Sequence, residues 1–438
     1  MNMEFQRLAT PPRQATRLDD IEGRFDQTIM WSAVFLAALG LVMVGSSSIA
    51  VAEGLGVGPF HFLIRHAVFL GLGAVLAGLI MRVELREMER HSHLLVMLGI
   101  LLLLAVFIPG IGRTVNGARR WLNLGITGFQ AVEAVKLFLI IWMASYLARY
   151  RDQVQSQWTA AFKPFLVVGA MVLLLLAQPD FGSAALLIAL TLCLIWLGGV
   201  RPVHVLVPLT VLTPLMVMVA MSESYRMRRL TSFMDPWKDP FNDGFQLTQA
   251  LIAIGRGEWA GVGLGGSVQK LFYLPEAHTD FIFSVMAEEL GFIGIVALLS
   301  LIGLLVWRAF KLGLRAVEMG RGFAGFCALG VGLWLALQSV VSIGVNLGLL
   351  PTKGLTLPFV SSGGSSVLMS CAALGLLLRV SYELDRSERQ VARHKESRAA
   401  PIEIVPVDEA LDLGPAPQPL RLGSRGRLRI EPSLGEIA

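Results

Sequence analysis

The sequence alternates between long apolar runs and shorter polar segments. An apolar run of about 18 or more residues is long enough to cross the hydrocarbon core of a bilayer as an α-helix. The pattern therefore predicts an all-α integral membrane protein with ten transmembrane helices. The predicted spans are 28–49, 62–81, 93–109, 129–148, 164–178, 181–198, 204–221, 281–307, 322–349 and 363–380.

Composition supports this class and excludes a soluble globular enzyme. Hydrophobic residues make up 54% of the chain and charged residues only 16%, whereas soluble proteins average about 25% charged residues. The three cysteines, Cys193, Cys327 and Cys371, all lie in apolar runs, which indicates buried thiols rather than a disulfide framework. The sequence contains no metal-ligand spacing and no P-loop, and nothing in it predicts nucleic-acid binding.

Lysine and arginine indicate on which side of the membrane a loop lies. They recur in every second loop, whereas the loop 50–61 contains none. The positive-inside rule then places both termini in the cytoplasm. We expect a cytoplasmic tail at 1–27, a ten-span domain at 28–384 and a disordered cytoplasmic tail at 385–438. Within the domain, residues 222–280 form a large extracytoplasmic loop between the seventh and eighth spans.

Two outer segments carry basic residues against this rule. The long loop 222–280 also contains acids, so a solvated loop explains its charges as well as a functional site does. In the segment 110–128, Arg119 and Arg120 precede Trp121, and no acid lies close in sequence. A cation pair beside a tryptophan at a membrane surface favours an anionic lipid head group.

Asp280 is the last polar residue before the eighth apolar run. A carboxylate at the outer boundary between water and lipid is placed to act as a general base on a lipid-linked substrate. His278 is a weaker candidate, because residues two apart on a helix do not face each other. Glu288 and Glu289 lie about two turns further along, and at least one of them should face the bundle interior.

Glu133 and Lys136 lie three residues apart at the start of the fourth span, so they share one face of a helix. Ionisable groups inside a membrane are costly and usually pair with each other or face a cavity. A structural ion pair and a cavity wall that touches substrate both agree with this pattern. Gln338 and Asn346 in the ninth span are expected to hydrogen-bond to neighbouring helices.

Two glycine-rich stretches have weaker signals. The stretch 261–267 resembles a phosphate-binding loop but lacks the following Lys-Ser/Thr of a P-loop, which favours a flexible or re-entrant outer loop. The stretch 361–366 opens the tenth span. Its serines fit a helix cap, and a helix N-terminus also fits a phosphate site, so both interpretations stay open.

Five motifs of this chain resemble those of the SEDS family, the shape, elongation, division and sporulation polymerases. The resemblance covers about residues 25–385, and the motifs follow the family's order. The run 351–354 is more similar to the division members than to the elongation members. Ala131–Val132 and Ser362 depart from the family pattern without removing a charge. The matching motifs are Asn116–Trp121, Gln130–Lys136, Gln178–Gly182, Leu274–Phe283 and Leu350–Ser361.

The resemblance implies a peptidoglycan glycosyltransferase that polymerises lipid II into β-1,4-linked glycan strands outside the cytoplasmic membrane. Asp280 would accept the proton of the GlcNAc 4-hydroxyl, and the anomeric centre would invert. Undecaprenyl pyrophosphate leaves, so no nucleotide is needed. Arg120, with Arg119 or a divalent cation (Mg²⁺ or Mn²⁺), would stabilise the charge of the leaving group. The other substrate-binding residues that the resemblance implies are Glu133, Lys136, Asp180, Glu276, Lys353 and Ser361.

The resemblance also implies a location and partners. These are the bacterial cytoplasmic (inner) membrane at the division septum, a class B penicillin-binding protein transpeptidase, FtsI, and other division proteins. Ten spans with buried charges also fit a flippase that moves lipid II, although no internal repeat typical of many transporters is evident. An elongation-type polymerase and a scaffold for the transpeptidase are further alternatives.

Overall fold

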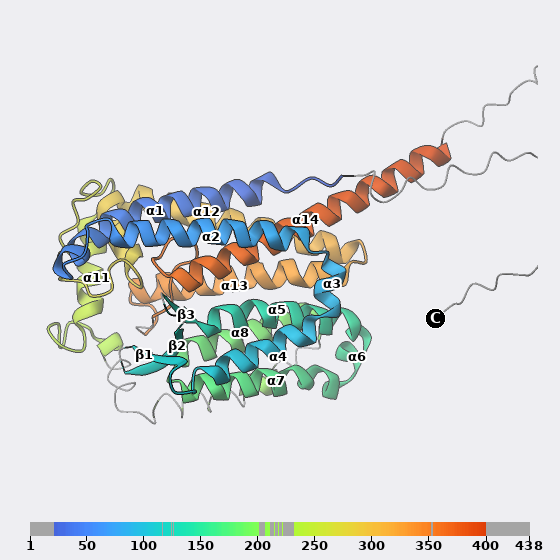
Figure 1. Ribbon diagram of the computed structural model, residues 1–438, viewed down its shortest axis with the longest axis horizontal. Helices are drawn as coiled ribbons and strands as arrows, with labels where there is room; N and C mark the ends of the chain where they lie inside the picture. The colour runs from blue at the N-terminus through green and yellow to red at the C-terminus, as the bar shows by residue number, and fades with distance from the viewer. Residues whose placement is uncertain are drawn as a thin grey trace, which may run out of the picture. The chain divides into compact units, whose positions relative to one another are not determined.

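The computed structural model describes residues 22–115, 117–123, 125, 127–200, 206–210, 214, 218, 221, 232–351 and 354–399. The chain forms two units, Met1–Arg389 and Gln390–Ala438. The first unit is a bundle of helices that lie side by side (Figure 1). The helices are α1 (Gln27–Gly54), α2 (His61–Arg82), α3 (Leu85–Arg90), α4 (Ser92–Ala105), α5 (Ala131–Arg149), α6 (Arg151–Ser156), α7 (Trp158–Ala177), α8 (Phe181–Leu197), α11 (Phe245–Arg256), α12 (Ile282–Glu318), α13 (Gly322–Asn346) and α14 (Gly364–Ala399).

Nine of the ten predicted spans coincide with a helix. Seven of these helices, α1, α2, α5, α7, α12, α13 and α14, are long and apolar enough to cross a membrane. The other two, α4 and α8, are apolar but shorter. The predicted span 204–221 lies mostly outside the described residues and stays a prediction. Helix α14 continues past the expected boundary at 384 to Ala399, and residues 1–21 and 400–438 of the expected tails lie outside the description.

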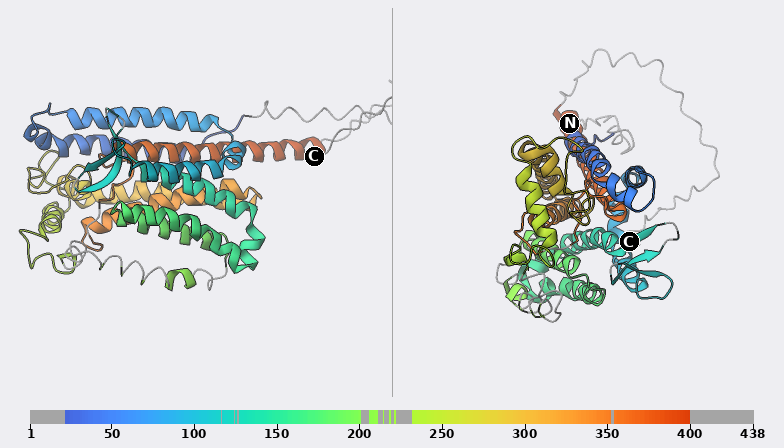
Figure 2. Two further views of the ribbon diagram at one scale, coloured as in Figure 1. Left: turned by 60° about the horizontal axis from the view of Figure 1, so that its bottom comes forward. Right: turned by 90° about the vertical axis from the view of Figure 1, so that its left-hand side faces the viewer.

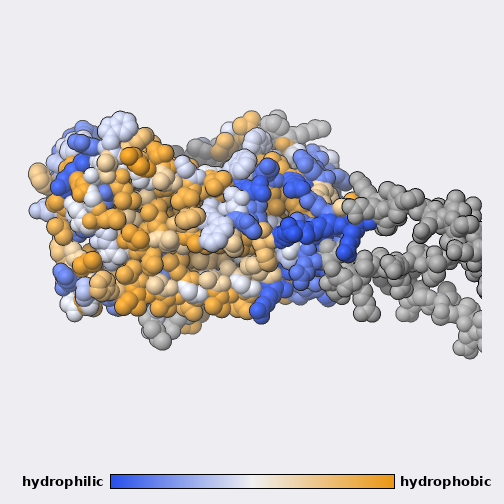
Figure 3. All heavy atoms as spheres, turned by 90° about the horizontal axis from the view of Figure 1, so that it is seen from above, coloured by the Kyte–Doolittle hydropathy of each residue, from blue (hydrophilic) through white to orange (hydrophobic). Residues whose placement is uncertain are grey.

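The surface of the bundle is apolar over much of its length. Leu72, Leu79, Leu101, Leu166 and Leu173 are all exposed on their helices. Figure 3 shows apolar residues covering the middle of one face, with hydrophilic residues gathered toward the ends. An exposed apolar surface of this extent would aggregate in water and is typical of a protein that lipid surrounds.

A small antiparallel sheet, to which the sequence analysis assigned no strands, forms at one end of the bundle. Its strands β1 (Gly112–Val115), β2 (Ala118–Asn123) and β3 (Gly128–Gln130) lie in the order β1-β2-β3. Figure 2 shows the sheet at the end where α11 and the outer loop also lie. Strand β3 leads directly into α5, so the sheet fixes the start of the helix that carries Glu133 and Lys136.

Helix α12 is broken at Gly291, which has φ 63° and ψ −165°. Residues 282–289 before the break are all buried, whereas Phe292 and Ile293 after it are 54% and 64% exposed. The side chains that face lipid therefore begin after Gly291. The first part of the predicted span 281–307 is a separate short helix inside the protein.

Residues 257–263 of the outer loop lie over this break. Four backbone hydrogen bonds join the two segments: Val262 to Glu288 (2.9 Å), Gly263 to Glu289 (3.1 Å), Phe292 to Glu258 (2.9 Å) and Ile293 to Trp259 (3.2 Å). A Cβ atom on Gly261 would lie 2.2 Å from the Glu289 carbonyl oxygen. Gly261 therefore allows two backbones to touch, and the start of the stretch 261–267 packs against the break.

Candidate active site

Asp280 lies at the end of the outer loop, just before α12, and its side chain is half-buried. Its carbonyl oxygen accepts a hydrogen bond from Asn346 Nδ2 (3.0 Å), and Asn346 Oδ1 accepts from Ser284 N (3.2 Å) and Oγ (2.7 Å). The end of α13 thus holds the start of α12, which confirms the helix-bridging role expected for Asn346. The position of the Asp280 backbone is fixed from a second helix.

The loop after α13 reaches the Asp280 carboxylate. A Cβ atom on Gly354 would stand 2.8 Å from Asp280 Oδ2, so a larger residue at this position would displace the carboxylate. Gln338 Nε2 donates to the Thr356 carbonyl (2.8 Å), and Ser362 N donates to the His278 carbonyl (3.0 Å). These bonds tie the loop both to α13 and to the segment before Asp280.

Two residues predicted to bind substrate belong to this same loop. The Ser361 hydroxyl is buried and accepts a hydrogen bond from Leu357 N (2.8 Å), so it closes a turn. Ser365, at the start of α14, accepts from Gln130 N (2.9 Å) and thereby joins the loop to β3. Lys353 lies outside the described residues, and its predicted role stays a prediction.

Glu133 and Lys136 form a fully buried ion pair with Nζ 2.8 Å from Oε2. Lys136 also donates to Gln338 Oε1 (2.7 Å) and lies 5.0 Å from the centre of the Trp334 ring. The charge of Lys136 is therefore balanced within the bundle. Because the same Gln338 amide holds Thr356 of the loop beside Asp280, the ion pair also supports that loop.

Arg120 and Asp180 meet at the tight turn between α7 and α8. Arg120 donates to the carbonyls of Gln178 (3.2 Å) and Pro179, and its Nη1 lies 4.0 Å from Asp180 Oδ1. Asp180 caps α8 by accepting from Ser183 N (3.2 Å) and Oγ (2.8 Å). Both residues therefore hold the hairpin together, while the side chain of Arg120 is still 30% exposed.

Arg119 points away from this turn. Its Nη2 donates to the Ile108 carbonyl (2.8 Å), which closes the base of the β1–β2 hairpin. The two neighbouring arginines thus hold different segments, as expected for adjacent residues on a strand.

Glu276 and His278 shape the turn that precedes Asp280. The Glu276 carboxylate is exposed and accepts from Thr279 Oγ1 (2.8 Å). His278 is buried, and its ring packs 4.8 Å from that of Phe62 on α2. Burial lowers the pKa of His278; the Glu276 carboxylate raises it and Arg65 lowers it further. This environment favours a neutral, packing role for His278.

Glu288 and Glu289 are both completely buried, which confirms the expectation that at least one faces inward. Glu288 pairs with Arg256 (2.7 Å) and Glu289 with Lys270 (2.6 Å). Ser46 of α1 also donates to Glu289 (2.6 Å). We call these contacts the outer-loop clamp, because they fix the outer loop to the short helix after Asp280. The two acids stand out in the sequence, whereas the basic residues of the outer loop fit a solvated loop and a functional site equally well.

No cluster of three His, Cys, Asp or Glu side chains that could hold a metal ion occurs in the described part of the chain. The expected Mg²⁺ or Mn²⁺ stays a prediction.

Comparison with known proteins agrees with these motifs. The profile of the FtsW/RodA/SpoVE family, described as a cell cycle protein, matches residues 27–386. A relative from Xanthomonas oryzae pv. oryzae, named "Probable peptidoglycan glycosyltransferase FtsW", is 53% identical over 97% of this chain and 93% of that protein. A Coxiella burnetii protein of the same name is 47% identical over 83% of this chain and 98% of its own length.

Solved structures show the same fold. A chain from a structure titled "Structural coordination of polymerization and crosslinking by a peptidoglycan synthase complex" is 32% identical and has a TM-score of 0.67 over 82% of this chain and 98% of that chain. The rod shape determining protein RodA of Thermus thermophilus is 32% identical, with a TM-score of 0.59 over 82% of this chain and 96% of its own. The chain therefore belongs to the FtsW/RodA/SpoVE family of cell cycle proteins, the SEDS family that its motifs resemble.

Proposed function

We propose that this protein is a peptidoglycan glycosyltransferase that polymerises lipid II into β-1,4-linked glycan strands and releases undecaprenyl pyrophosphate. The placement of Asp280 carries the proposal. Its carboxylate is half-buried and lies against the backbone at Gly354, and its backbone carbonyl accepts a hydrogen bond from Asn346. The relatives named FtsW support the same activity.

Asp280 acts as the general base. A sugar hydroxyl is a poor nucleophile, and a carboxylate within hydrogen-bond reach raises its reactivity by taking the proton. The GlcNAc O4 of the acceptor then attacks C1 of the donor sugar opposite the pyrophosphate, the C1–O bond breaks, and the anomeric centre inverts. One displacement of this kind needs no covalent enzyme intermediate, by analogy with inverting hydrolases.

Arg120 stabilises the leaving pyrophosphate. Two carbonyls hold its guanidinium in place while part of the side chain stays exposed, so its remaining N–H groups are oriented before substrate arrives. A divalent cation, Mg²⁺ or Mn²⁺, would share this charge when bound. Glu133 and Lys136 stabilise the loop beside Asp280. Their main role is this indirect one, and contact with substrate comes second.

The protein works in division at the septum of the cytoplasmic membrane, with both termini inside and Asp280 outside. The relatives named FtsW support the division role. The structural neighbour from a peptidoglycan synthase complex supports a crosslinking partner, for which the class B penicillin-binding protein FtsI is the candidate.

The decisive experiment supplies lipid II to the purified protein with this partner and separates glycan products on a gel. Asp280→Asn should lower polymerisation by roughly 10²- to 10⁴-fold, the usual contribution of a general base. Asp243→Asn, the matched loss of an exposed carboxylate elsewhere in the outer loop, should polymerise at nearly the wild-type rate. Wild-type activity in Asp280→Asn contradicts the assignment. Transfer of labelled lipid II between leaflets without polymer would instead indicate a flippase.

A further inference from the structure

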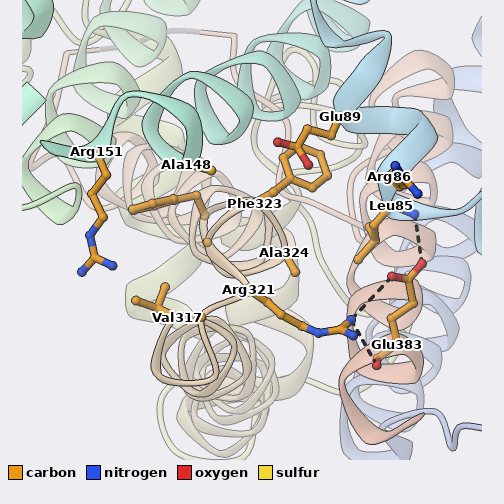
Figure 4. A pocket seen from close by; sticks show the side chains of 13 residues that line it. Leu85, Arg86, Glu89, Ala148, Arg151, Val317, Arg321, Phe323, Ala324 and Glu383 are labelled. Carbon is orange, nitrogen blue, oxygen red and sulfur yellow. Dashed lines mark hydrogen bonds and ion pairs between the residues drawn. The ribbon is translucent and has the colours of Figure 1, made fainter. Parts of the chain in front are cut away.

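A cavity of about 380 Å³ lies at the end of the bundle opposite Asp280. It opens where α5, α12 and α14 reach this end and α13 begins, with α3 and α6 at its sides. Figure 4 shows Arg86 and Arg151 at opposite sides of this space. Its apolar lining includes Ala148, Phe323 and Ala324. The cavity therefore combines an apolar floor with a basic rim.

The acids of the cavity neutralise that rim only in part. Glu383 accepts from Leu85 N (2.9 Å) and Arg379 Nε (2.8 Å), and Arg321 lies 3.8 Å from its second oxygen. Both oxygens of the Glu383 carboxylate are therefore engaged in contacts that join α3, α13 and α14. Glu89 is the one other acid among the residues that line the cavity, so Arg86 and Arg151 leave an excess of one positive charge there.

Arg86 and Arg151 remain available for a ligand. Both side chains are exposed, and neither makes an ion pair or hydrogen bond with another side chain in the part of the chain that the structure describes. A guanidinium without a partner beside an apolar floor matches a ligand with a phosphate and a hydrocarbon part. Arginine binds phosphate with two parallel hydrogen bonds, which makes it the suitable cation for such a group.

We propose that this cavity binds the head group of an anionic phospholipid, with Arg86 and Arg151 contacting its phosphate and the apolar lining receiving the adjoining glycerol. Basic pockets between membrane-spanning helices are typical sites for such head groups. Toward the other end of the bundle, α5 carries Lys136, α12 begins with the segment after Asp280, and α13 carries Gln338. A lipid in the cavity would thus hold together the ends of the helices that build the candidate site. This binding does not depend on the proposed activity.

Native mass spectrometry of the purified full chain tests the proposal, with phosphatidylglycerol and phosphatidylcholine as probes. The double variant Arg86→Gln/Arg151→Gln should bind the first phosphatidylglycerol about thirtyfold more weakly than wild type, the combined effect of two arginines at an anionic lipid surface. The control Arg82→Gln/Arg90→Gln removes the same charge from exposed residues near the same end that do not line the cavity. It should keep wild-type binding, and thermal unfolding should show that both variants fold.

Three results would overturn the proposal. The proposal is wrong if the cavity variant binds phosphatidylglycerol as tightly as wild type. It is also wrong if the control loses as much affinity as the cavity variant, or if wild type binds phosphatidylcholine as tightly as phosphatidylglycerol. Inorganic phosphate and pyrophosphate separate a lipid from a free anion. If either displaces phosphatidylglycerol at an equal concentration, the site recognises the phosphate alone and the lipid assignment is wrong.

Discussion

Gly291→Ala should disturb the start of α12 more than any other single methyl group added to that helix. The backbone of Gly291 has φ 63° and ψ −165°, a region that only glycine occupies readily and that costs other residues roughly 1–3 kcal/mol. The new Cβ would also lie 2.3 Å from Gly261 N and 2.7 Å from the carbonyl carbons of Trp259 and Ala260. All three atoms belong to backbone, so the outer loop must move.

The movement has a calculable cost. It would strain the hydrogen bonds from Val262 and Gly263 to the short helix after Asp280, and each is worth about 1 kcal/mol. The total loss of stability is therefore about 3–5 kcal/mol. Because a displacement of about 1 Å at a catalytic group can lower a rate by roughly 100-fold, polymerisation should fall as well.

Thermal unfolding in detergent and the lipid II polymerisation assay measure the two effects. Gly303→Ala is the matched control, since it lies in the same helix and nothing stands within 4 Å of its added Cβ. That substitution should raise stability by up to about 1 kcal/mol, the difference in helix propensity, and leave polymerisation unchanged. An unfolding temperature and rate for Gly291→Ala equal to wild type would refute the packing described for the break.

Three further predictions concern the surroundings of Asp280. Gly354→Ala places a methyl group 2.8 Å from Asp280 Oδ2 and should lower polymerisation by roughly ten- to a hundredfold with little change in unfolding temperature; an unchanged rate would contradict the contact. Lys270→Met leaves Glu289 buried without its cation and should cost about 3–5 kcal/mol in thermal unfolding, and adding Glu289→Gln should recover part of it. Because burial lowers the pKa of His278, unfolding below about pH 6.5 takes up a proton that the folded protein excludes. Stability should therefore fall as pH decreases from about 6.5 toward the lowered pKa, and His278→Asn should show a weaker fall.

The membrane architecture could be predicted from the sequence because it rests on local properties. Span length and apolar composition are counted along the chain, and nine predicted spans coincide with helices. Ionisable residues such as Glu133, Lys136 and Asp280 stand out for the same reason, since a charge within or beside an apolar run is costly unless something compensates it. The family motifs then indicated the chemistry that we propose for those residues.

The partners of these residues depended on contacts between segments far apart in the sequence. In the outer-loop clamp, Lys270 pairs with Glu289, and Ser46 of α1, 243 residues away in sequence, donates a hydrogen bond to the same carboxylate. The start of the glycine-rich stretch 261–267 packs on the break at Gly291, a contact that nothing local in the sequence reveals. The short strands before α5 escaped prediction, since three to six residues carry too weak a pattern.

The sequence by itself determined that this is a membrane protein of the SEDS family and that Asp280 is its candidate base. Only the tertiary structure decided which groups hold that base: Asn346 on its backbone, Gly354 beside its carboxylate, and the outer-loop clamp behind it. The physical reason is that hydropathy and length act residue by residue along a helix. A buried hydrogen bond or ion pair exists only where folding brings two distant side chains within about 3 Å of each other.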